Sequence, residues 1–555
     1  MERIWLKSYP PSVPADINPD EYKSLVELFE TSVGKYGERP AFNNLGRTIR
    51  FAELDRMSRD FGAWLQAKGL ARGARVALMM PNCLQYPVAM FGVLRAGDTV
   101  VNVNPLYTAR ELEYQLRDCG AEAIVILENF AHVLQEVRAR TPIKHVVVTS
   151  LGELLGLKGL IVNLVVRKLK KMVPAYELPG AISFKNVLKE GKDKPLDTPA
   201  LGRDDIAFLQ YTGGTTGVSK GAMLLHRNVI AALLQYKAWL APLMGEERAV
   251  IITALPLYHI FSLTVNCLVM MVVGGENVLI TNPRDIPGFV KELAKHRYSM
   301  ISGVNTLFNA LLNHPDFARL DFSALRLAVG GGMAVQKAVA ERWKQVTGTP
   351  IIEGYGLTET APSATANPLN VTEFTGAIGV PMSSTEVVLR DDDNRDLPLG
   401  QAGEICIRGP QVMAGYWQRP EETAEVLGKD GFLHTGDIGV MDEKGYIRVV
   451  DRKKDMIVVS GFKVFPNEIE QVVNMLPGVL ECAVIGVPDE HSGEVPKVFV
   501  VKKDPQLTEQ DVLEHCRKEL TGYKRPKYVE FRTELPKTNV GKILRRALRE
   551  EKKAA

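Results

Sequence analysis

Cysteine and histidine are scarce in this chain, and neither forms a metal or redox motif. The 555 residues include six cysteines and nine histidines, with no CxxC pair and no HExxH helix. The cysteines lie far apart in the sequence, which favours a reducing compartment over a disulfide framework. The composition therefore gives no sign of a zinc site or a disulfide-stabilised domain.

An excess of charge is also missing. With 68 basic and 65 acidic side chains the formal net charge is +3, so we expect no nucleic-acid partner. The longest apolar run, residues 263–273, is too short to span a bilayer and is expected to be buried core. Residues 1–16 contain no apolar stretch of the kind found in secretory signals, so we expect a cytoplasmic protein.

What is present is an ordinary globular composition, 46% apolar and 24% charged, in a chain several domains long. Through the first 360 residues, strand-like runs such as 76–80, 207–212 and 325–330 alternate with amphipathic helical patterns. This alternation is typical of an α/β fold with largely parallel sheets.

The pattern changes twice in the last third of the chain. Short strands and Gly-rich turns indicate a β-rich subdomain between residues 376 and 450, and a compact α+β pattern follows the charged run 451–455. We therefore predict a large N-terminal lobe, 1–450, built of layered α/β subdomains plus the β-rich subdomain. A small α+β C-terminal domain, 451–555, should follow it.

One segment, 155–176, combines an apolar body with four clustered cations, Arg167, Lys168, Lys170 and Lys171. A basic amphipathic segment of this kind can lie on an anionic membrane surface. It can equally be a surface helix packed on its own domain with a solvated basic edge. The first interpretation predicts peripheral contact with membrane lipid, on the cytoplasmic face of the inner membrane.

The most informative stretch is YTGGTTGVSKG, residues 211–221. Its glycines allow backbone N–H groups to approach an anion, its threonines add hydroxyl donors, and its lysine adds positive charge. It is not a Walker A loop, because Ser219 stands where that motif needs glycine. A strand-like run precedes it and a helical pattern follows, so we expect a phosphate-binding loop between strand and helix. The candidate residues are Thr212, Gly213, Gly214, Thr215, Thr216, Gly217 and Lys220.

A second motif overlaps this loop. Residues 217–221 fit GxSxG, the nucleophile elbow of serine esterases, with Ser219 as nucleophile and Asp437 and His491 as partners. An elbow turns sharply from strand to helix, whereas five residues separate Tyr211 from Gly217. The esterase is therefore a minor alternative.

The loop resembles the signature loop of the adenylate-forming (AMP-producing) acyl-CoA synthetase superfamily. Gly213 and Ser219 replace the commoner Ser and Pro, and this variant resembles bacterial long-chain fatty-acid–CoA ligases. Further family-like motifs follow in order: PLYHIF (256–261), GGGM (330–333), EGYGLTET (353–360), HTGDIG (434–439), DRKKDMIVVSGFKVFPNEIE (451–470) and PKTNVGK (536–542).

The resemblance implies a long-chain fatty-acid–CoA ligase that uses ATP, CoA and Mg²⁺. Such an enzyme converts a fatty acid to acyl-CoA, AMP and diphosphate through an acyl-adenylate. A medium-chain or aryl/cinnamoyl-CoA ligase would share these motifs, and a catalytically silent nucleotide- or lipid-binding scaffold is a third alternative. The oligomeric state stays open, a homodimer being one expectation.

The resemblance also implies roles for particular residues. Tyr355 would stack on adenine, Asp437 would bind both ribose hydroxyls, and Arg452 would contact the ribose and phosphate region. Glu359 and Thr212 would hold Mg²⁺, for which carboxylate oxygen is a suitable ligand. Taken alone, Tyr355 could equally fill the core, and Glu359 could be a charge near a helix start.

Three further roles follow from the same resemblance. Lys542 would bridge the carboxylate substrate and the α-phosphate, His259 would lie near the acyl and pantetheine channels, and Lys454 would be the hinge of the mobile domain. Residues 301–312 resemble the segment that lines the acyl tunnel. The remaining candidate nucleotide-binding residues are Gly332, Glu353, Gly354, Gly356, Thr358, Gly461 and Lys463.

Overall fold

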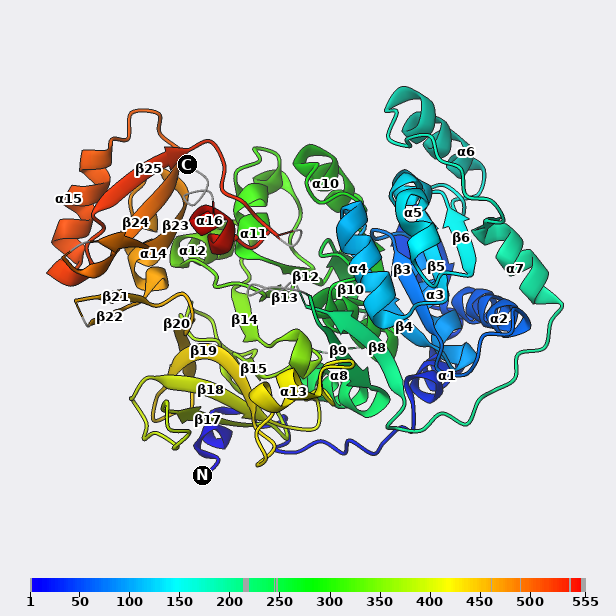
Figure 1. Cartoon of the computed structure of the whole chain (residues 1–555), viewed down its shortest axis with the longest axis horizontal. Coiled ribbons are helices and arrows are strands. Elements are labelled where there is room, and N and C mark those ends of the chain that lie inside the picture. Colours follow the sequence, from blue (N-terminus) through cyan, green and yellow to red (C-terminus); the bar gives the residue numbers. More distant parts are fainter. Residues whose placement is uncertain are drawn as a thin grey trace.

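The computed structural model describes residues 2–212, 219–243, 245, 248–460, 462–489, 491–538 and 541–550. Within that part of the chain the strands form four β-sheets, and helices pack on both faces of the two largest (Figure 1). Three sheets belong to a large N-terminal domain and the fourth to a smaller C-terminal domain. The predicted α/β fold class is confirmed.

The first sheet runs in the order β7 (Ile182–Ser183), β6 (His145–Thr149), β5 (Ala123–Leu127), β3 (Arg75–Met79), β4 (Thr99–Asn102), β8 (Ile206–Tyr211) and β9 (Gly221–Leu225). All neighbours are parallel except β8 and β9. Side chains alternate along β3, where Val76 and Leu78 join one apolar cluster and Ala77 and Met79 another. The flanking helices are α2 (Phe51–Ala67), α3 (Gln85–Ala96) and α7 (Phe184–Lys192) on one face, and α4 (Ala109–Cys119) and α5 (Ala131–Val137) on the other.

The second sheet runs in the order β16 (Val380–Pro381), β15 (Thr365–Ala366), β14 (Ile351–Tyr355), β13 (Leu327–Gly330), β12 (Met300–Gly303), β10 (Val250–Thr253), β11 (Glu276–Leu279), β1 (Pro40–Asn44) and β2 (Arg47–Arg50). One face carries α1 (Leu25–Tyr36), α8 (His226–Leu240), the π-helix η6 (Ser262–Leu268) and α9 (Val269–Val273). The other carries α10 (Ile286–Leu293), α11 (Asn305–Leu312) and α12 (Lys337–Thr347). The apolar run 263–273 is buried as far as Met271, as expected.

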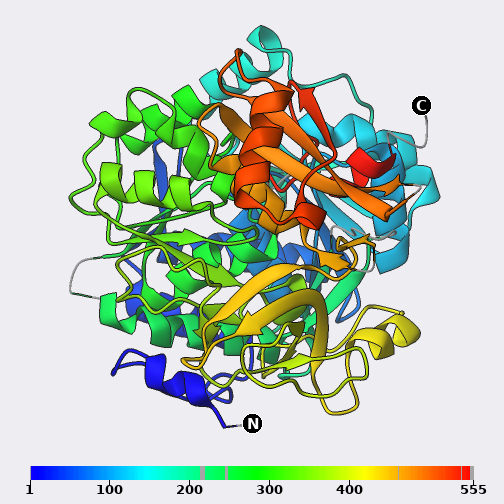
Figure 2. The ribbon, with the colours of Figure 1, turned by 90° about the vertical axis from the view of Figure 1, so that its left-hand side faces the viewer.

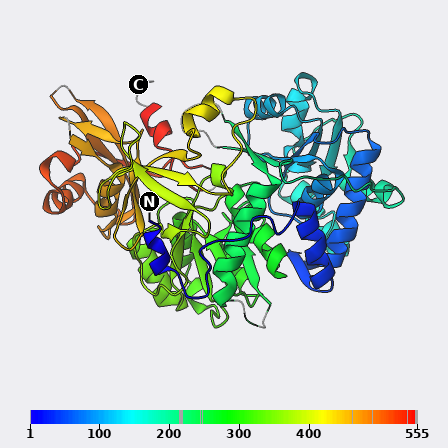
Figure 3. The same ribbon diagram turned by 90° about the horizontal axis from the view of Figure 1, so that it is seen from below.

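The third sheet is antiparallel and contains β17 (Glu386–Arg390), β18 (Gly403–Arg408), β19 (Leu433–Met441) and β20 (Ile447–Arg452), with α13 (Pro420–Val426) between β18 and β19. The N-terminal segment crosses the underside of the molecule to reach it (Figure 3). There Ser8 donates to the Lys444 carbonyl oxygen at 2.8 Å, and Trp5 packs against Gly445.

The C-terminal domain follows β20 and lies against one end of the N-terminal domain (Figures 1 and 2). Its sheet runs β22 (Phe462–Val464), β21 (Ile457–Val459), β24 (Gly493–Lys502) and β23 (Val479–Asp489), with β25 (Tyr528–Arg532) parallel to β24. Its helices are α14 (Pro466–Asn474), α15 (Glu509–Glu519) and α16 (Arg545–Glu550).

Arg545 forms an ionic centre in this domain. Its guanidinium lies 3.2 Å from the carboxylate of Asp451 and 2.8 Å from that of Glu470, and it also donates to Asn467. Burial raises the pKa of Asp451 although Arg545 opposes that shift. Because Asp451 belongs to β20, Arg545 ties the last described helix to the strand that leads out of the N-terminal domain.

Replacing Arg545 tests this arrangement. Arg545→Gln leaves the buried Asp451 and the half-buried Glu470 without their cation, and we expect about 3 kcal/mol of lost local stability. That loss corresponds to roughly 150-fold faster amide hydrogen exchange in α14 and β23. Arg546→Gln is the matched control, because its ion pair with Glu550 is exposed, and its exchange should stay within about twofold of wild type. Equal exchange in Arg545→Gln and wild type would contradict the role given to Arg545.

Candidate active site

The predicted site residues gather along one edge of the second sheet. Strands β10, β12, β13 and β14 are parallel, so the loops that follow them open on the same side. His259 follows β10, Thr306 follows β12, Gly332 follows β13, and Tyr355 ends β14. In open α/β sheets, ligands bind in the crevice outside the carboxyl ends of the strands.

Tyr355, Asp437 and Arg452 form a hydrogen-bonded cluster at this edge. The Tyr355 hydroxyl donates to Asp437 Oδ2 at 2.6 Å, and Arg452 Nε lies 3.1 Å from Asp437 Oδ1. Asp437 and Arg452 face each other across β19 and β20. Burial and the Asp437 charge raise the pKa of Tyr355. A carboxylate accepts several hydrogen bonds at once, so Asp437 keeps the capacity to accept two further hydroxyls.

Lys542 reaches this cluster from the C-terminal domain. Its backbone N–H donates to Thr538 Oγ1 at 3.1 Å, and its carbonyl oxygen accepts from the Thr538 N–H at 2.7 Å. The preceding Gly541, at φ +85°, lies so close to α11 that a Cβ would be 2.7 Å from Thr306 Oγ1. Glycine at 541 therefore allows the close approach of this loop to the N-terminal domain.

The Lys542 ammonium interacts electrostatically with groups of both domains, and these interactions shift pKa values. Burial and then the Arg452 guanidinium lower the pKa of Lys542 to about 8, while Asp437 acts in the opposite direction. Burial and then the Lys542 ammonium lower the pKa of His259 to about 4. His259 is thus neutral near pH 7 and can accept a hydrogen bond without competing for positive charge.

Glycines in the loops after β13 and β14, and the buried Glu353 between them, determine the backbone conformation there. A Cβ on Gly356 would be 1.6 Å from the Pro362 carbonyl oxygen, so no larger residue fits there without a shift of the backbone. Gly332 has φ +75°, in the left-handed region. Glu353 is buried and accepts from the Val335 N–H at 3.3 Å, and burial raises its pKa to about 7.

Glu359 lies in the 3₁₀ turn η8 (Thr358–Thr360) and contacts the stretch that contains Tyr416. The Tyr416 hydroxyl donates to its Oε1 at 2.7 Å. The Lys220 ammonium lies 5.1 Å from the centroid of the Tyr416 ring. The structure therefore brings together two predicted residues, Glu359 and Lys220, through a third that the sequence did not suggest.

Tyr416 is the residue that sequence prediction missed. It lies in a short stretch after β18, where the Met223 N–H donates to the Gly415 carbonyl oxygen at 2.8 Å. Its sequence context, Gly-Tyr-Trp shortly before Pro420, has neither helical nor strand periodicity. An aromatic residue in such a loop was the available signal.

A metal ion beside Glu359 would be held partly by protein oxygens and partly by the phosphates of a bound nucleotide. No group of three or more His, Cys, Asp or Glu that could hold a metal occurs among the residues with described positions. Glu359 has one carboxylate oxygen that accepts from Tyr416 and a second for a cation. Mg²⁺ commonly binds one or two protein oxygens together with substrate phosphates, and Glu359 with Thr212 suits that pattern.

The phosphate-loop expectation needs one correction. The loop connects two antiparallel strands, with Tyr211 of β8 opposite Gly221 of β9, and helix α8 begins only at His226. The Thr212 N–H donates to the Lys220 carbonyl oxygen at 2.9 Å, which closes the base of the hairpin. The predicted helix is present as α8, but the short buried strand β9 that separates it from the loop was not predicted. Gly213, Gly214, Thr215, Thr216 and Gly217 lie outside the described residues.

The same hairpin argues against the esterase alternative. Ser219 lies two residues before the start of β9 and donates its hydroxyl to the Thr212 carbonyl oxygen. This is not the strand-to-helix turn that exposes a nucleophilic serine. His491 lies in the turn between β23 and β24 of the C-terminal domain, where its N–H donates to Asp489.

Other predicted residues have mixed positions. Lys454 lies between β20 and β21, and burial followed by Arg452 lowers its pKa to about 8. Lys463 is exposed on β22, with its ammonium 3.9 Å from Asp392, so it pairs away from the Tyr355 cluster. Gly354 of β14 lies opposite Ala366 of β15. Thr358 is the first residue of the 3₁₀ turn that contains Glu359. Gly461 lies outside the described residues.

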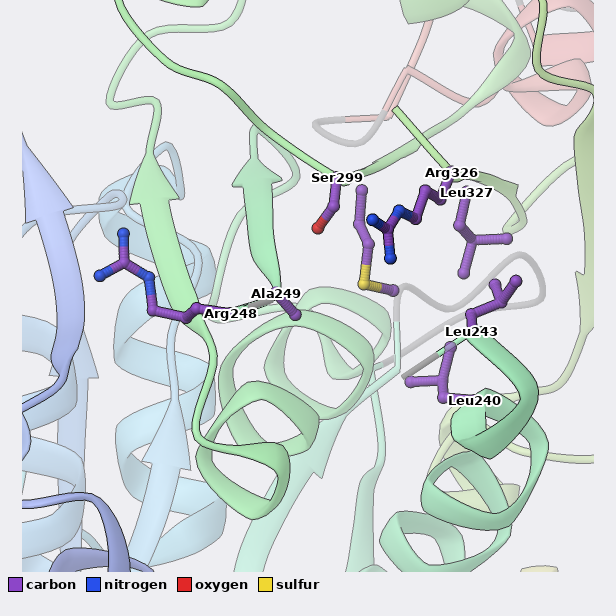
Figure 4. A pocket seen from close by; sticks show the side chains of 8 residues that line it. Leu240, Leu243, Arg248, Ala249, Ser299, Arg326 and Leu327 are labelled. Carbon is purple, nitrogen blue, oxygen red and sulfur yellow. The ribbon is translucent and has the colours of Figure 1, made fainter. Parts of the chain in front are cut away.

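A small cavity lies at the opposite edge of the second sheet (Figure 4). It is lined by the amino-terminal ends of β12 and β13, the approach to β10 and the end of α8. Its position separates it from the carboxyl edge where the site residues meet. The lining residues are Leu240, Leu243, Arg248, Ala249, Ser299, Met300, Arg326 and Leu327.

Comparison with known protein families identifies the class of protein. A family model described as AMP-binding enzyme matches residues 29–417, and one described as AMP-binding enzyme C-terminal domain matches residues 468–542. The chain therefore belongs to the AMP-binding enzyme family. The second match ends at Lys542, within the loop that contacts Thr306.

Individual relatives resemble the chain over its full length. The long-chain-fatty-acid–CoA ligase of Yersinia pestis is 60% identical over 553 residues, which cover 99% of this chain and 98% of the relative. The protein of the same name from Escherichia coli O6:H1 is 59% identical with the same coverage. The solved structure of the anthranilate CoA ligase AuaEII in complex with anthranoyl-AMP is similar with a TM-score of 0.85, at 27% identity over 97% of this chain and 99% of that one.

Proposed function

We propose that this chain is an AMP-forming long-chain fatty-acid–CoA ligase. The observation that carries the proposal is the close approach of Gly541, next to Lys542 in the C-terminal domain, to Thr306 of the N-terminal domain. It brings the Lys542 ammonium within electrostatic range of Asp437 and Arg452, which are themselves paired. Relatives 59–60% identical along the whole chain are long-chain-fatty-acid–CoA ligases, which supports the same substrates here. The reaction would convert ATP, a fatty acid and CoA to acyl-CoA, AMP and diphosphate.

In the first half-reaction the fatty carboxylate attacks the α-phosphorus of ATP, and diphosphate leaves. Asp437 and Tyr355 would hold the nucleoside, and Lys220 with Thr212 would hold the leaving phosphates. Two anions approach each other in this step, so the Lys542 ammonium stabilises the transition state more than the separated substrates. Mg²⁺ held by Glu359 and Thr212 would supply further charge compensation on the phosphates.

In the second half-reaction the CoA thiolate attacks the acyl carbonyl, and AMP leaves. No protein nucleophile is required, because the acyl-adenylate is already activated. We assign residues 1–450 to the adenylation lobe and 451–555 to a domain that rotates between the two steps, with Lys454 as the hinge. The place of Lys454 in the connection between β20 and β21 supports this assignment. A cytoplasmic location and a homodimer stay predictions of the sequence.

ATP–diphosphate exchange across a series of carboxylic acids tests the function. Saturated acids from butyrate to palmitate should give a kcat/KM that rises by about fourfold per added buried methylene until the tunnel is filled. Anthranilate and cinnamate are the aryl controls and should give low exchange. A maximum with an aryl or medium-chain acid would replace the long-chain assignment by the corresponding ligase. Absence of exchange with every acid would refute ligase activity and favour a silent scaffold.

The basic amphipathic segment supports peripheral membrane contact as a further part of the proposal. Helix α6 (Leu157–Leu164) stands at the outer edge of the first sheet (Figure 1) and continues as a π-helix over Val165–Leu169. Its Asn163 side chain accepts from the Gly152 N–H at 2.8 Å. The side of α6 that carries Gly159, Val162 and Asn163 faces the protein, whereas Leu157 and Leu160 are 87% and 70% exposed.

Most of the apolar side chains of α6 are therefore exposed to solvent and are not packed on its own domain. Further exposed apolar side chains follow at Ile161, Leu164 and Leu169, beside the exposed cations Lys168, Lys170 and Lys171. Apolar surface next to clustered cations suits an anionic bilayer surface. Within the described ranges no helix is both long enough and apolar enough to cross a membrane, so the contact would be with one leaflet.

Vesicle sedimentation tests this contact. The protein should bind vesicles of phosphatidylcholine with one-fifth phosphatidylglycerol, and neutral vesicles much less. Replacing Lys168, Lys170 and Lys171 by Gln should weaken binding by roughly 100-fold, at about 1 kcal/mol per cation. The matched control replaces Arg517 and Lys518 of α15 by Gln and should bind as wild type does. Unchanged binding of the triple variant would contradict the assignment of this surface.

A further inference from the structure

Asp118 is a buried carboxylate that joins three separate segments near the proposed phosphate loop. It lies in the last turn of α4, and its side chain is 10% exposed. The hydroxyl of Tyr211, the last residue of β8, donates to Asp118 Oδ2 at 2.6 Å. Arg419, which precedes α13, donates to Asp118 Oδ1 at 2.6 Å. Asp118 therefore holds both β8 and the start of α13 against α4.

Tyr114, one turn earlier on α4, contacts the other strand of the same hairpin. Its hydroxyl donates to the Ser219 carbonyl oxygen at 3.0 Å. The Arg419 guanidinium lies 3.4 Å from the same hydroxyl. Helix α4 therefore contacts the β8–β9 hairpin on both strands, at Tyr211 before the loop and at Ser219 after it.

The Arg419 side of this network leads to the charged residues of the site. Arg419 Nε lies 3.6 Å from one carboxylate oxygen of Glu422, and the other oxygen lies 2.5 Å from Lys220 Nζ. Lys220 in turn lies over the ring of Tyr416, whose hydroxyl donates to Glu359. The contacts thus run from α4 to the two side chains proposed to serve the phosphates and Mg²⁺.

We infer that Asp118 is a positioning residue for the ATP half-reaction. Its charge fixes Tyr211 and Arg419, and through them it places Lys220 where the phosphates of ATP bind. This inference rests on the proposed function. The Asp118 side chain is 10% exposed and that of Arg419 is 33% exposed. A charge-assisted hydrogen bond in such a partly desolvated place is stronger and more directional than a fully exposed one, so the carboxylate charge matters for the placement.

The same region is also held by backbone pairing, which makes the role separable from folding. The Trp417 N–H donates to the Gly221 carbonyl oxygen at 2.8 Å, and Ala222 pairs with Tyr416. Loss of the Asp118 charge should therefore displace side chains at the loop base and leave the strands paired.

Asp118→Asn tests the inference, because asparagine keeps the shape and an acceptor oxygen for Tyr211 but removes the charge. The KM for ATP in the exchange assay should rise about tenfold, the size expected for one charge-assisted hydrogen bond. Thioester formation from supplied acyl-AMP should stay within about twofold of wild type, because the β- and γ-phosphates of ATP are absent from that step. Glu113→Gln is the matched control, since Glu113 lies on the same helix and pairs with Arg117 and Arg140 near the surface; its KM for ATP should be unchanged.

A second variant keeps the test decisive if Asp118→Asn folds poorly. Arg419→Gln removes the other half of the pair and should raise the KM for ATP similarly, and the double variant should be no worse than Asp118→Asn alone. An unchanged KM for ATP in folded Asp118→Asn or Arg419→Gln, an additive double variant, or equal loss of both half-reactions would overturn the inference. Absence of exchange in the wild-type protein would instead refute the proposed function.

Discussion

A lysine ammonium held where water is scarce is the constraint on which this site depends. Burial and the neighbouring Arg452 guanidinium both disfavour the charged form of Lys542, and Asp437 only partly offsets them. Bound anions would stabilise the charged form of Lys542, because the Coulomb interaction is strong in a partly desolvated site. A carboxylate and a phosphate that meet at Lys542 would satisfy the ammonium and each other. The electrostatics therefore favour the chemistry in which two anions must approach.

The position of this lysine depends on how the C-terminal domain is built. Arg545, three residues after Lys542, is paired with Asp451 and Glu470 inside that domain. Lys542 is thus anchored to the end of β20, three residues before the proposed hinge at Lys454. A rotation at Lys454 would carry Lys542, Arg545 and Glu470 together and would move them relative to Asp451, which precedes the hinge. In this way one lysine could serve one half-reaction and leave the site for the other.

Much of the fold could be predicted from the sequence because apolar runs and their spacing determine strands and helices. The runs 76–80, 207–212 and 325–330 correspond to β3, β8 and β13 within one or two residues. The hairpin after Tyr211 was assigned wrongly, since a short buried strand such as β9 cannot be distinguished from the start of a helix by periodicity. Its antiparallel pairing with β8 depends on tertiary contacts that the local sequence does not encode.

Prediction of the site was limited in the same way. Motif resemblance pointed to Tyr355 and Asp437, which the structure joins by a hydrogen bond. Tyr416 and Asp118 were missed because each acts through partners distant in sequence, and neither has a local pattern of its own. Lys463 shows the opposite error. Its place in a family-like motif predicted nucleotide binding, but its side chain is exposed and lies near Asp392 on the surface.

The most direct test of the central claim is the rate of acyl-adenylate formation as a function of pH, measured by rapid quench in wild type and Lys542→Ala. The ammonium is present below its pKa and is lost as the pH rises through it, so the wild-type rate should fall above pH 8, near the pKa of about 8. Lys542→Ala should be slower by about 100-fold or more and should lack this fall. Thioester formation from supplied acyl-AMP should be retained in the variant. A wild-type rate that stays constant through this range, or equal loss of both half-reactions in Lys542→Ala, would contradict the account.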